Sequence, residues 1–145
     1  MYKSLPFIVQ FFSFALIAAA FTLFFGGNWK EALISAIIGG FNQIAVMISE
    51  RFRFNKIFSR FLCSAIVTLL AFFAVKFNFI DMVDTVIIGN IMTLIPGVGL
   101  TNAIRDLFIG DSISGILRSV EAVLNALAIA AGYLLIAFFT GGIAL

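Results

Sequence analysis

Polar residues lie on both sides of an interruption in the apolar stretch VIIGNIMTLIPGVGLTNAIRDLFIGD. Before the interruption, Asn90, Thr93 and Gly97 are spaced three and four residues apart, so they share one face of a helix. After it, Thr101 and Asn102 stand near the start of a second helical piece, whose first amides carry partial positive charge. Because such a start favours a carboxylate ligand, these residues could form a pocket for a small zwitterion or acid.

The interruption is the sequence Pro-Gly-Val-Gly, from Pro96 to Gly99. Proline removes a backbone donor and glycine relaxes the backbone, so an uninterrupted helix is not expected. Many transporters build a substrate site on a broken helix with polar residues, and a turn between two helices at the cytoplasmic face is the alternative. The residues predicted to bind substrate are Asn90, Thr93, Gly97, Gly99, Thr101 and Asn102. For Thr101 and Asn102, capping of their own backbone is the alternative.

Ionisable residues follow the interruption and continue into the next apolar segment. Arg105 and Asp106 are adjacent, so on a helix they point about 100° apart and need other partners. Arg118, Glu121 and Asn125 are spaced three and four residues apart and share one helical face. We expect Arg105 to pair with Glu121, and the ion-pair or coupling group to comprise Arg105, Asp106, Glu121 and Asn125. A static ion pair is favoured over proton coupling, because Glu121 lies near enough to the interface to reach water.

The composition identifies an integral membrane protein and excludes several classes of function. Of 145 residues, 63% are hydrophobic and 11% are charged, whereas soluble domains are about half apolar and a quarter charged. The chain has no His and a single cysteine, Cys63, so we expect no internal disulfide, no metal site and no cofactor. Without a histidine base or a phosphate-binding glycine motif, we predict that the chain is not an enzyme. The small basic excess flanks the apolar segments, which indicates topology rather than nucleic-acid binding.

Five apolar segments predict an all-α, polytopic membrane fold with about five transmembrane helices in a single domain, residues 1–145. The segments run from Pro6 to Phe25, Ala32 to Ile48, Phe61 to Phe79, Val83 to Ile95 and Ile113 to Phe139. The fourth is only ~20 Å long as a helix, against a ~30 Å bilayer core. It reaches span length only by including the break at Pro96-Gly97 and continuing to Phe108. Gly110 and Asp111 predict the next helix boundary, because glycine suits a helix end and aspartate a helix start.

The distribution of Lys and Arg predicts the orientation. The link between the second and third segments, SERFRFNKIFSR, holds four basic residues and only one acidic residue, Glu50, so it should be cytoplasmic. Five spans then place the N-terminus inside the cell and the C-terminus outside, whereas four spans would reverse one end. The basic residues expected inside are Lys3, Arg51, Arg53, Lys56, Arg60, Arg105 and Arg118, and those expected outside are Lys30 and Lys76.

Small and polar residues of the second segment are assigned to helix packing. Ser35, Gly39 and Asn42 are spaced four and three residues apart on one face, and small residues let helices approach closely in lipid. Asn42 and Gln43 could also hydrogen-bond to neighbouring helices.

The residues from Leu94 to Ala122, LIPGVGLTNAIRDLFIGDSISGILRSVEA, resemble the threonine/serine exporter family. That family shows a similar proline–glycine break, a Thr-Asn-Ala sequence followed by Arg-Asp, and a Gly-Asp before the next helix. A weaker likeness, which includes FFGGNWKEAL, extends over essentially the whole chain. Carried over by position, the motif residues are Pro96, Gly97, Thr101, Asn102, Arg105 and Asp106.

The resemblance implies a subunit or half of a secondary exporter in the bacterial inner membrane, which moves threonine and serine out of the cell on an ion gradient. The chain looks like the membrane part of the larger, N-terminal-type component, without the soluble region that usually precedes the first span. Because five spans make a thin bundle, the expected partners are membrane lipid, a small-molecule substrate, and a second membrane subunit or another copy. The alternatives are an exporter of small dicarboxylates and a non-transporting membrane scaffold.

Overall fold

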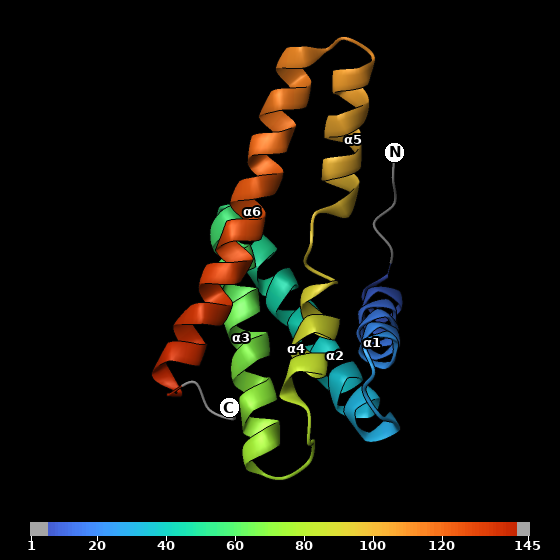
Figure 1. Ribbon diagram of the computed structural model, residues 1–145, viewed down its shortest axis with the longest axis vertical. Helices are drawn as coiled ribbons and strands as arrows, with labels where there is room; N and C mark the ends of the chain where they lie inside the picture. The colour runs from blue at the N-terminus through green and yellow to red at the C-terminus, as the bar shows by residue number, and fades with distance from the viewer. Residues whose placement is uncertain (1–5, 142–145) are drawn as a thin grey trace.

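The computed structural model describes residues 6–141, which fold into helices joined by short links (Figure 1). The helices are α1 (Phe7–Phe24), α2 (Trp29–Arg51), α3 (Lys56–Lys76), α4 (Val83–Ile91), α5 (Gly97–Phe108) and α6 (Ser112–Phe139). Four of these, α1, α2, α3 and α6, are long and apolar enough to cross a membrane. The predicted all-α membrane fold is therefore confirmed. Lys3, which is expected on the inner side of the membrane, lies outside the described residues.

The fourth predicted segment forms two short helices instead of one rod. α4 has nine residues and α5 has twelve, so neither alone crosses a ~30 Å core. The predicted break is present, and it already begins after Ile91, where tight turn bonds run from the amide of Thr93 to Asn90 O (3.1 Å) and from Leu94 to Ile91 O (2.8 Å). Pro96 disfavours the helical conformation only at Ile95, the residue before it, so α4 ends earlier than the proline requires. A fifth crossing through this broken segment stays a prediction.

Close helix contacts hold the bundle together. α1 packs on α2 and α4, and α3 packs on α6. A Cβ added at Gly132 of α6 would clash with the carbonyl oxygen of Phe61 on α3, and one at Gly89 of α4 would clash with Thr22 Oγ1 on α1. Glycine at these two positions therefore lets the helix backbones approach, as expected for packing within lipid.

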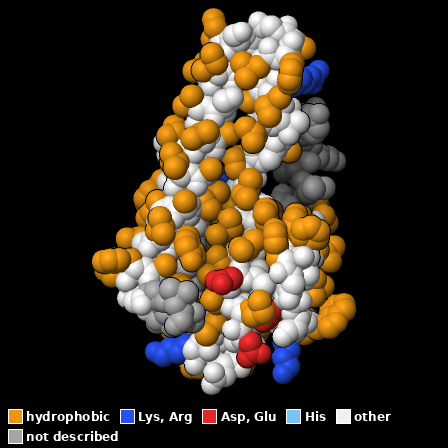
Figure 2. Space-filling view, in the orientation of Figure 1, with side chains coloured by type: hydrophobic (Ala, Val, Ile, Leu, Met, Phe, Trp, Pro, Cys, Tyr) orange, Lys and Arg blue, Asp and Glu red, His pale blue; other side chains and the backbone are white. Residues whose placement is uncertain are grey.

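α5 and the first half of α6 form a hairpin that rises above the other helices (Figure 1). Gly110 has a φ of +91°, and the Asp111 side chain accepts a hydrogen bond from the amide of Ser114 (3.2 Å). The predicted helix boundary at these residues is thus confirmed. Hydrophobic side chains cover most of the face in Figure 2, and charged side chains on that face lie toward its two ends, as expected for a protein surrounded by lipid.

Candidate substrate-binding cavity

A cavity of about 520 Å³ opens where the α2–α3 link, the start of α5 and α6 meet. We call it the polar cavity. Its volume lies within the range of roughly 300–1,000 Å³ that is typical of small-molecule sites. The lining residues are Val46, Ser49, Glu50, Phe54, Lys56, Ser59, Arg60, Pro96, Gly99, Arg118, Glu121, Ala122 and Asn125.

Charged side chains of both signs line the polar cavity, namely the basic Lys56, Arg60 and Arg118 and the acidic Glu50 and Glu121. Lys56 Nζ lies 3.9 Å from Glu121 Oε1, and their side chains are 81% and 57% exposed. An ion pair this exposed contributes only ~0–1 kcal/mol, since water screens it. Both charges therefore remain available to a ligand that carries an ammonium and a carboxylate group.

Two buried polar atoms beside the cavity have no hydrogen-bond partner among residues 6–141. They are Ser49 Oγ and Asn125 Oδ1, on residues that are 5% and 6% exposed. A buried polar group left unpaired costs about 1–3 kcal/mol. A ligand or water that pairs with these atoms would recover that free energy.

The start of α5 adds backbone donors to the same cavity. Pro96 occupies the N-cap position, where it offers no side-chain hydrogen bond, and Pro96 and Gly99 both line the cavity. Within the described part of the chain, the amides of Val98 and Gly99 have no hydrogen-bond acceptor, and of these two residues Gly99 lines the cavity. Because amides at a helix start carry partial positive charge, this edge of the cavity suits a carboxylate.

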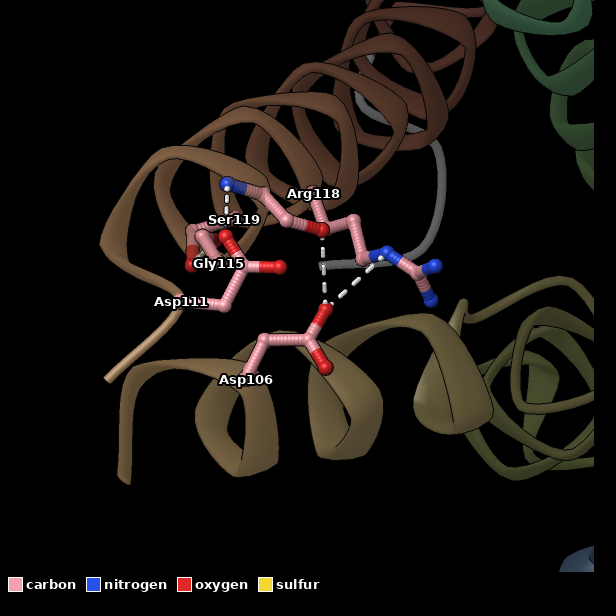
Figure 3. A network of polar contacts seen from close by, with 6 residues as sticks. Asp106, Asp111, Gly115, Arg118 and Ser119 are labelled. Atoms are coloured by element: carbon pink, nitrogen blue, oxygen red, sulfur yellow. Dashed lines mark hydrogen bonds and ion pairs between the residues drawn. The ribbon is translucent and has the colours of Figure 1, made fainter. Parts of the chain in front are cut away.

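A hydrogen-bonded ion pair joins the two helices of the hairpin (Figure 3). Arg118 Nε lies 3.2 Å from Asp106 Oδ2, and the Ser114 hydroxyl donates to the same oxygen over 3.0 Å. The Asp106 side chain is only 18% exposed, so this pair is less screened than the one between Lys56 and Glu121. Asp106 thereby restrains Arg118, which also lines the polar cavity.

The ionisable residues have partners that differ from the expected ones. The expected pair of Arg105 with Glu121 does not form: Arg105 is exposed and makes no ion pair with any described residue. Glu121 lies against Lys56 instead, and Asp106 lies against Arg118. Arg105 points elsewhere because it is adjacent to Asp106, and only one of two adjacent helical residues can face α6.

Capping of the first amides of α5, the alternative role expected for Thr101 and Asn102, is not observed. α5 already begins at Gly97, so both residues lie in its second turn. The Thr101 hydroxyl donates to the carbonyl oxygen of Gly97 (2.9 Å) within the helix. Asn102 is half-buried.

The predicted site residues do not gather in one place. Gly99, Glu121 and Asn125 line the polar cavity. Three predicted residues of α5 are not among its lining residues, namely Gly97, Thr101 and Asn102. Asn90 and Thr93 pack against α2, where they hydrogen-bond to its polar side chains.

Sequence reasoning missed the contribution of the α2–α3 link. Ser49, Glu50 and Arg60 line the cavity, whereas the sequence of their segment by itself indicates only topology. The high density of charge in SERFRFNKIFSR was the available indication of a site.

Comparison with known proteins gives the family. No curated protein and no solved structure matches the chain. A family model described as "Putative threonine/serine exporter" matches residues 2–140. The chain therefore belongs to the threonine/serine exporter family.

Proposed function

We propose that the chain is a subunit or half of a secondary exporter of small polar amino acids, threonine and serine, and that the polar cavity receives the substrate. Family membership supports the substrate class. The observation that carries the proposal is a cavity in the volume range of small-molecule sites, with both signs of charge and unpaired polar atoms. The basic α2–α3 link at its mouth favours the cytoplasmic side, as an exporter requires.

The chemistry of the lining fits a zwitterion. Arg60, Arg118 and the first amides of α5 offer donors to a carboxylate. Glu50, Glu121 and the unpaired Asn125 Oδ1 offer acceptors to an ammonium group. The Ser49 hydroxyl can pair with a substrate hydroxyl, the group that threonine and serine share.

Replacing Arg60 by alanine should weaken threonine binding by about tenfold, the loss expected for one hydrogen bond to a charged group. The measurement is binding of radiolabelled threonine to the purified full chain in detergent. The matched control is Lys76→Ala, at the opposite end of α3 and away from the cavity, which should bind threonine like the unmodified chain. Equal weakening by both substitutions would contradict a specific role for the cavity.

The purified chain and radiolabelled threonine also distinguish a half-transporter from a scaffold. A half-transporter binds threonine alone but shows counterflow in proteoliposomes only with a second membrane subunit. A complete transporter shows counterflow without any partner. A scaffold neither binds threonine nor shows counterflow with any partner.

Export of dicarboxylates is the second candidate, because basic side chains in the lining outnumber acidic ones by three to two. The substitution Glu121→Gln distinguishes the two substrates. If the ligand is a zwitterion, removing this carboxylate weakens threonine binding by about tenfold. If the ligand is a dicarboxylate, removing a like charge strengthens the binding of labelled succinate. A threonine affinity unchanged by Glu121→Gln would exclude Glu121 as the ammonium partner.

A further inference from the structure

A row of polar side chains runs along the inner face of α2. Glu31, Ser35, Asn42 and Ser49 are 1%, 0%, 0% and 5% exposed. Spacings of four, seven and seven residues return to the same face of a helix with 3.6 residues per turn. Polar groups in the interior of a membrane bundle are costly, and they often mark the path of a substrate or ion. We call this row the α2 stripe, and its Ser49 end lies at the polar cavity.

The broken segment meets the middle of the α2 stripe. Asn90 Nδ2 donates to Ser35 Oγ (2.9 Å), and Asn42 Nδ2 donates to Thr93 Oγ1 (3.3 Å). Thr22 of α1 joins them through a hydrogen bond from its hydroxyl to Ser35 Oγ (2.6 Å). These five residues form what we call the Asn42–Asn90 cluster.

The cluster has spare acceptors. The Ser35 hydroxyl donates to Ala18 O (3.1 Å) and the Thr93 hydroxyl to Asn90 O (2.6 Å). Asn42 Oδ1 and Asn90 Oδ1 are buried and have no partner among the described residues. A ligand that completes the cluster must therefore bring hydrogen-bond donors, as an ammonium or a hydroxyl group does.

A short apolar turn links the Asn42–Asn90 cluster to the polar cavity. Leu94 and Ile95 stand between Thr93 of the cluster and Pro96 of the cavity lining. Leu94 is 0% exposed and forms a buried apolar group with Cys63 and Ile129, against which Val46 of the cavity lining packs. Leu94 belongs to the turn between α4 and α5 rather than to either helix, so it can move without disrupting a helix.

We propose that the Asn42–Asn90 cluster is an occluded substrate site, which continues the polar cavity and is closed from it by Leu94. The ligand is a small amino acid, whose ammonium and hydroxyl groups pair with the two unpaired amide oxygens. This inference rests on the proposed function and adds to it a second site and a gate. It also assigns Ser35 and Asn42, which the sequence suggested were packing residues, to the substrate path.

Accessibility of single cysteines tests the gate. Cys63 is the only cysteine in the chain, so Cys63→Ala provides the background for Ser49→Cys, Asn42→Cys and Phe41→Cys. The probe is methanethiosulfonate ethylammonium, a small cation, applied to the full chain in detergent. Ser49→Cys should react fast and Asn42→Cys slowly. Adding Leu94→Ala should speed the reaction at Asn42→Cys at least tenfold.

The matched control for this effect is Phe41→Cys, adjacent to Asn42 on α2 but 55% exposed on the outer surface. Its reaction rate should not change with Leu94→Ala. An unchanged rate at Asn42→Cys, or an equal rise at both positions, would overturn the gate. If Leu94→Ala does not fold, the smaller change Leu94→Val is used, with a rise of at least threefold at Asn42→Cys alone as the criterion.

A second arm separates this inference from the proposed function. Each cysteine variant removes one proposed ligand group, so threonine is used at about tenfold above the concentration that the unmodified chain requires. It should then slow the labelling of Ser49→Cys when Leu94 is unchanged, and the labelling of both Ser49→Cys and Asn42→Cys when Leu94→Ala is added. Protection of Ser49→Cys alone, with Leu94 replaced, supports the polar cavity and overturns the occluded site. No protection at either position contradicts threonine as the ligand, whereas the dependence of labelling on Leu94 still reports the gate.

Discussion

Replacing Glu31 by alanine should lower the free energy of unfolding by about 3 kcal/mol, because three donors would lose one acceptor group. The carboxylate accepts hydrogen bonds from the amide of Asn28 (3.0 Å), the amide of Met82 (2.9 Å) and the hydroxyl of Thr85 (3.2 Å). It thus joins the start of α2 to the start of α4, where negative charge is also favoured by both helix dipoles. The measurement is the melting temperature of the purified chain in detergent.

The matched control is Glu50→Ala, the same change at the other end of α2, where the carboxylate is exposed. Stability should then change by no more than about 0.5 kcal/mol. The melting temperature of Glu31→Gln should lie between those of Glu31→Ala and Glu50→Ala, since an amide keeps one acceptor oxygen and loses the charge. Equal melting temperatures for Glu31→Ala and Glu50→Ala would show that the carboxylate does not hold the two helices together.

The contacts of Glu31 are only partly predictable from the sequence. Asn28 and Glu31 stand three residues apart at the start of α2, the spacing of a capping box, and could have been recognised from the sequence. The contacts of Glu31 with Met82 and Thr85 could not, because more than fifty residues separate the partners. Local patterns predict helix ends, whereas contacts between distant segments depend on how the helices pack.

The broken segment likewise combines local features that the sequence predicts with contacts between distant residues that it does not predict. Pro96 and Gly97 made the break predictable, and Gly110 and Asp111 made the next helix boundary predictable. The end of α4 at Ile91 was not predictable, because it depends on Asn90 and Thr93 bonding to Ser35 and Asn42 of α2. Those bonds also explain why Asn90 and Thr93 lie at the α2 stripe instead of in the polar cavity.

The polar cavity was only partly predictable for a related reason. Helical spacing places Glu121 and Asn125 on one face, and both line the cavity. Their pairing was not predictable, since the basic link is brought to α6 by the packing of α3 on α6. A link that reads as a topology signal in isolation thereby becomes one wall of a site.

Straightening the broken segment with Pro96→Ala, Gly97→Ala and Gly99→Ala together should reduce threonine binding by tenfold or more. Without proline, the backbone can continue as one helix from Val83 to Phe108, about 39 Å long at 1.5 Å per residue. Leu94 would then leave its packed position, and the free amides at the start of α5 would be consumed by helix hydrogen bonds. Binding of radiolabelled threonine to the purified chain measures the effect, with the melting temperature as the check on folding.

The single substitution Gly97→Ala is the control for that experiment, because an added Cβ there meets no atom within 4 Å and alanine is a good helix former. It leaves Pro96 in place, so the break and the polar cavity should persist and threonine binding should be retained. If the triple variant folds and binds threonine like Gly97→Ala, the break has no part in forming the site. If only the triple variant loses binding, the amides released by the break and the turn that carries Leu94 are part of the machinery that receives the substrate.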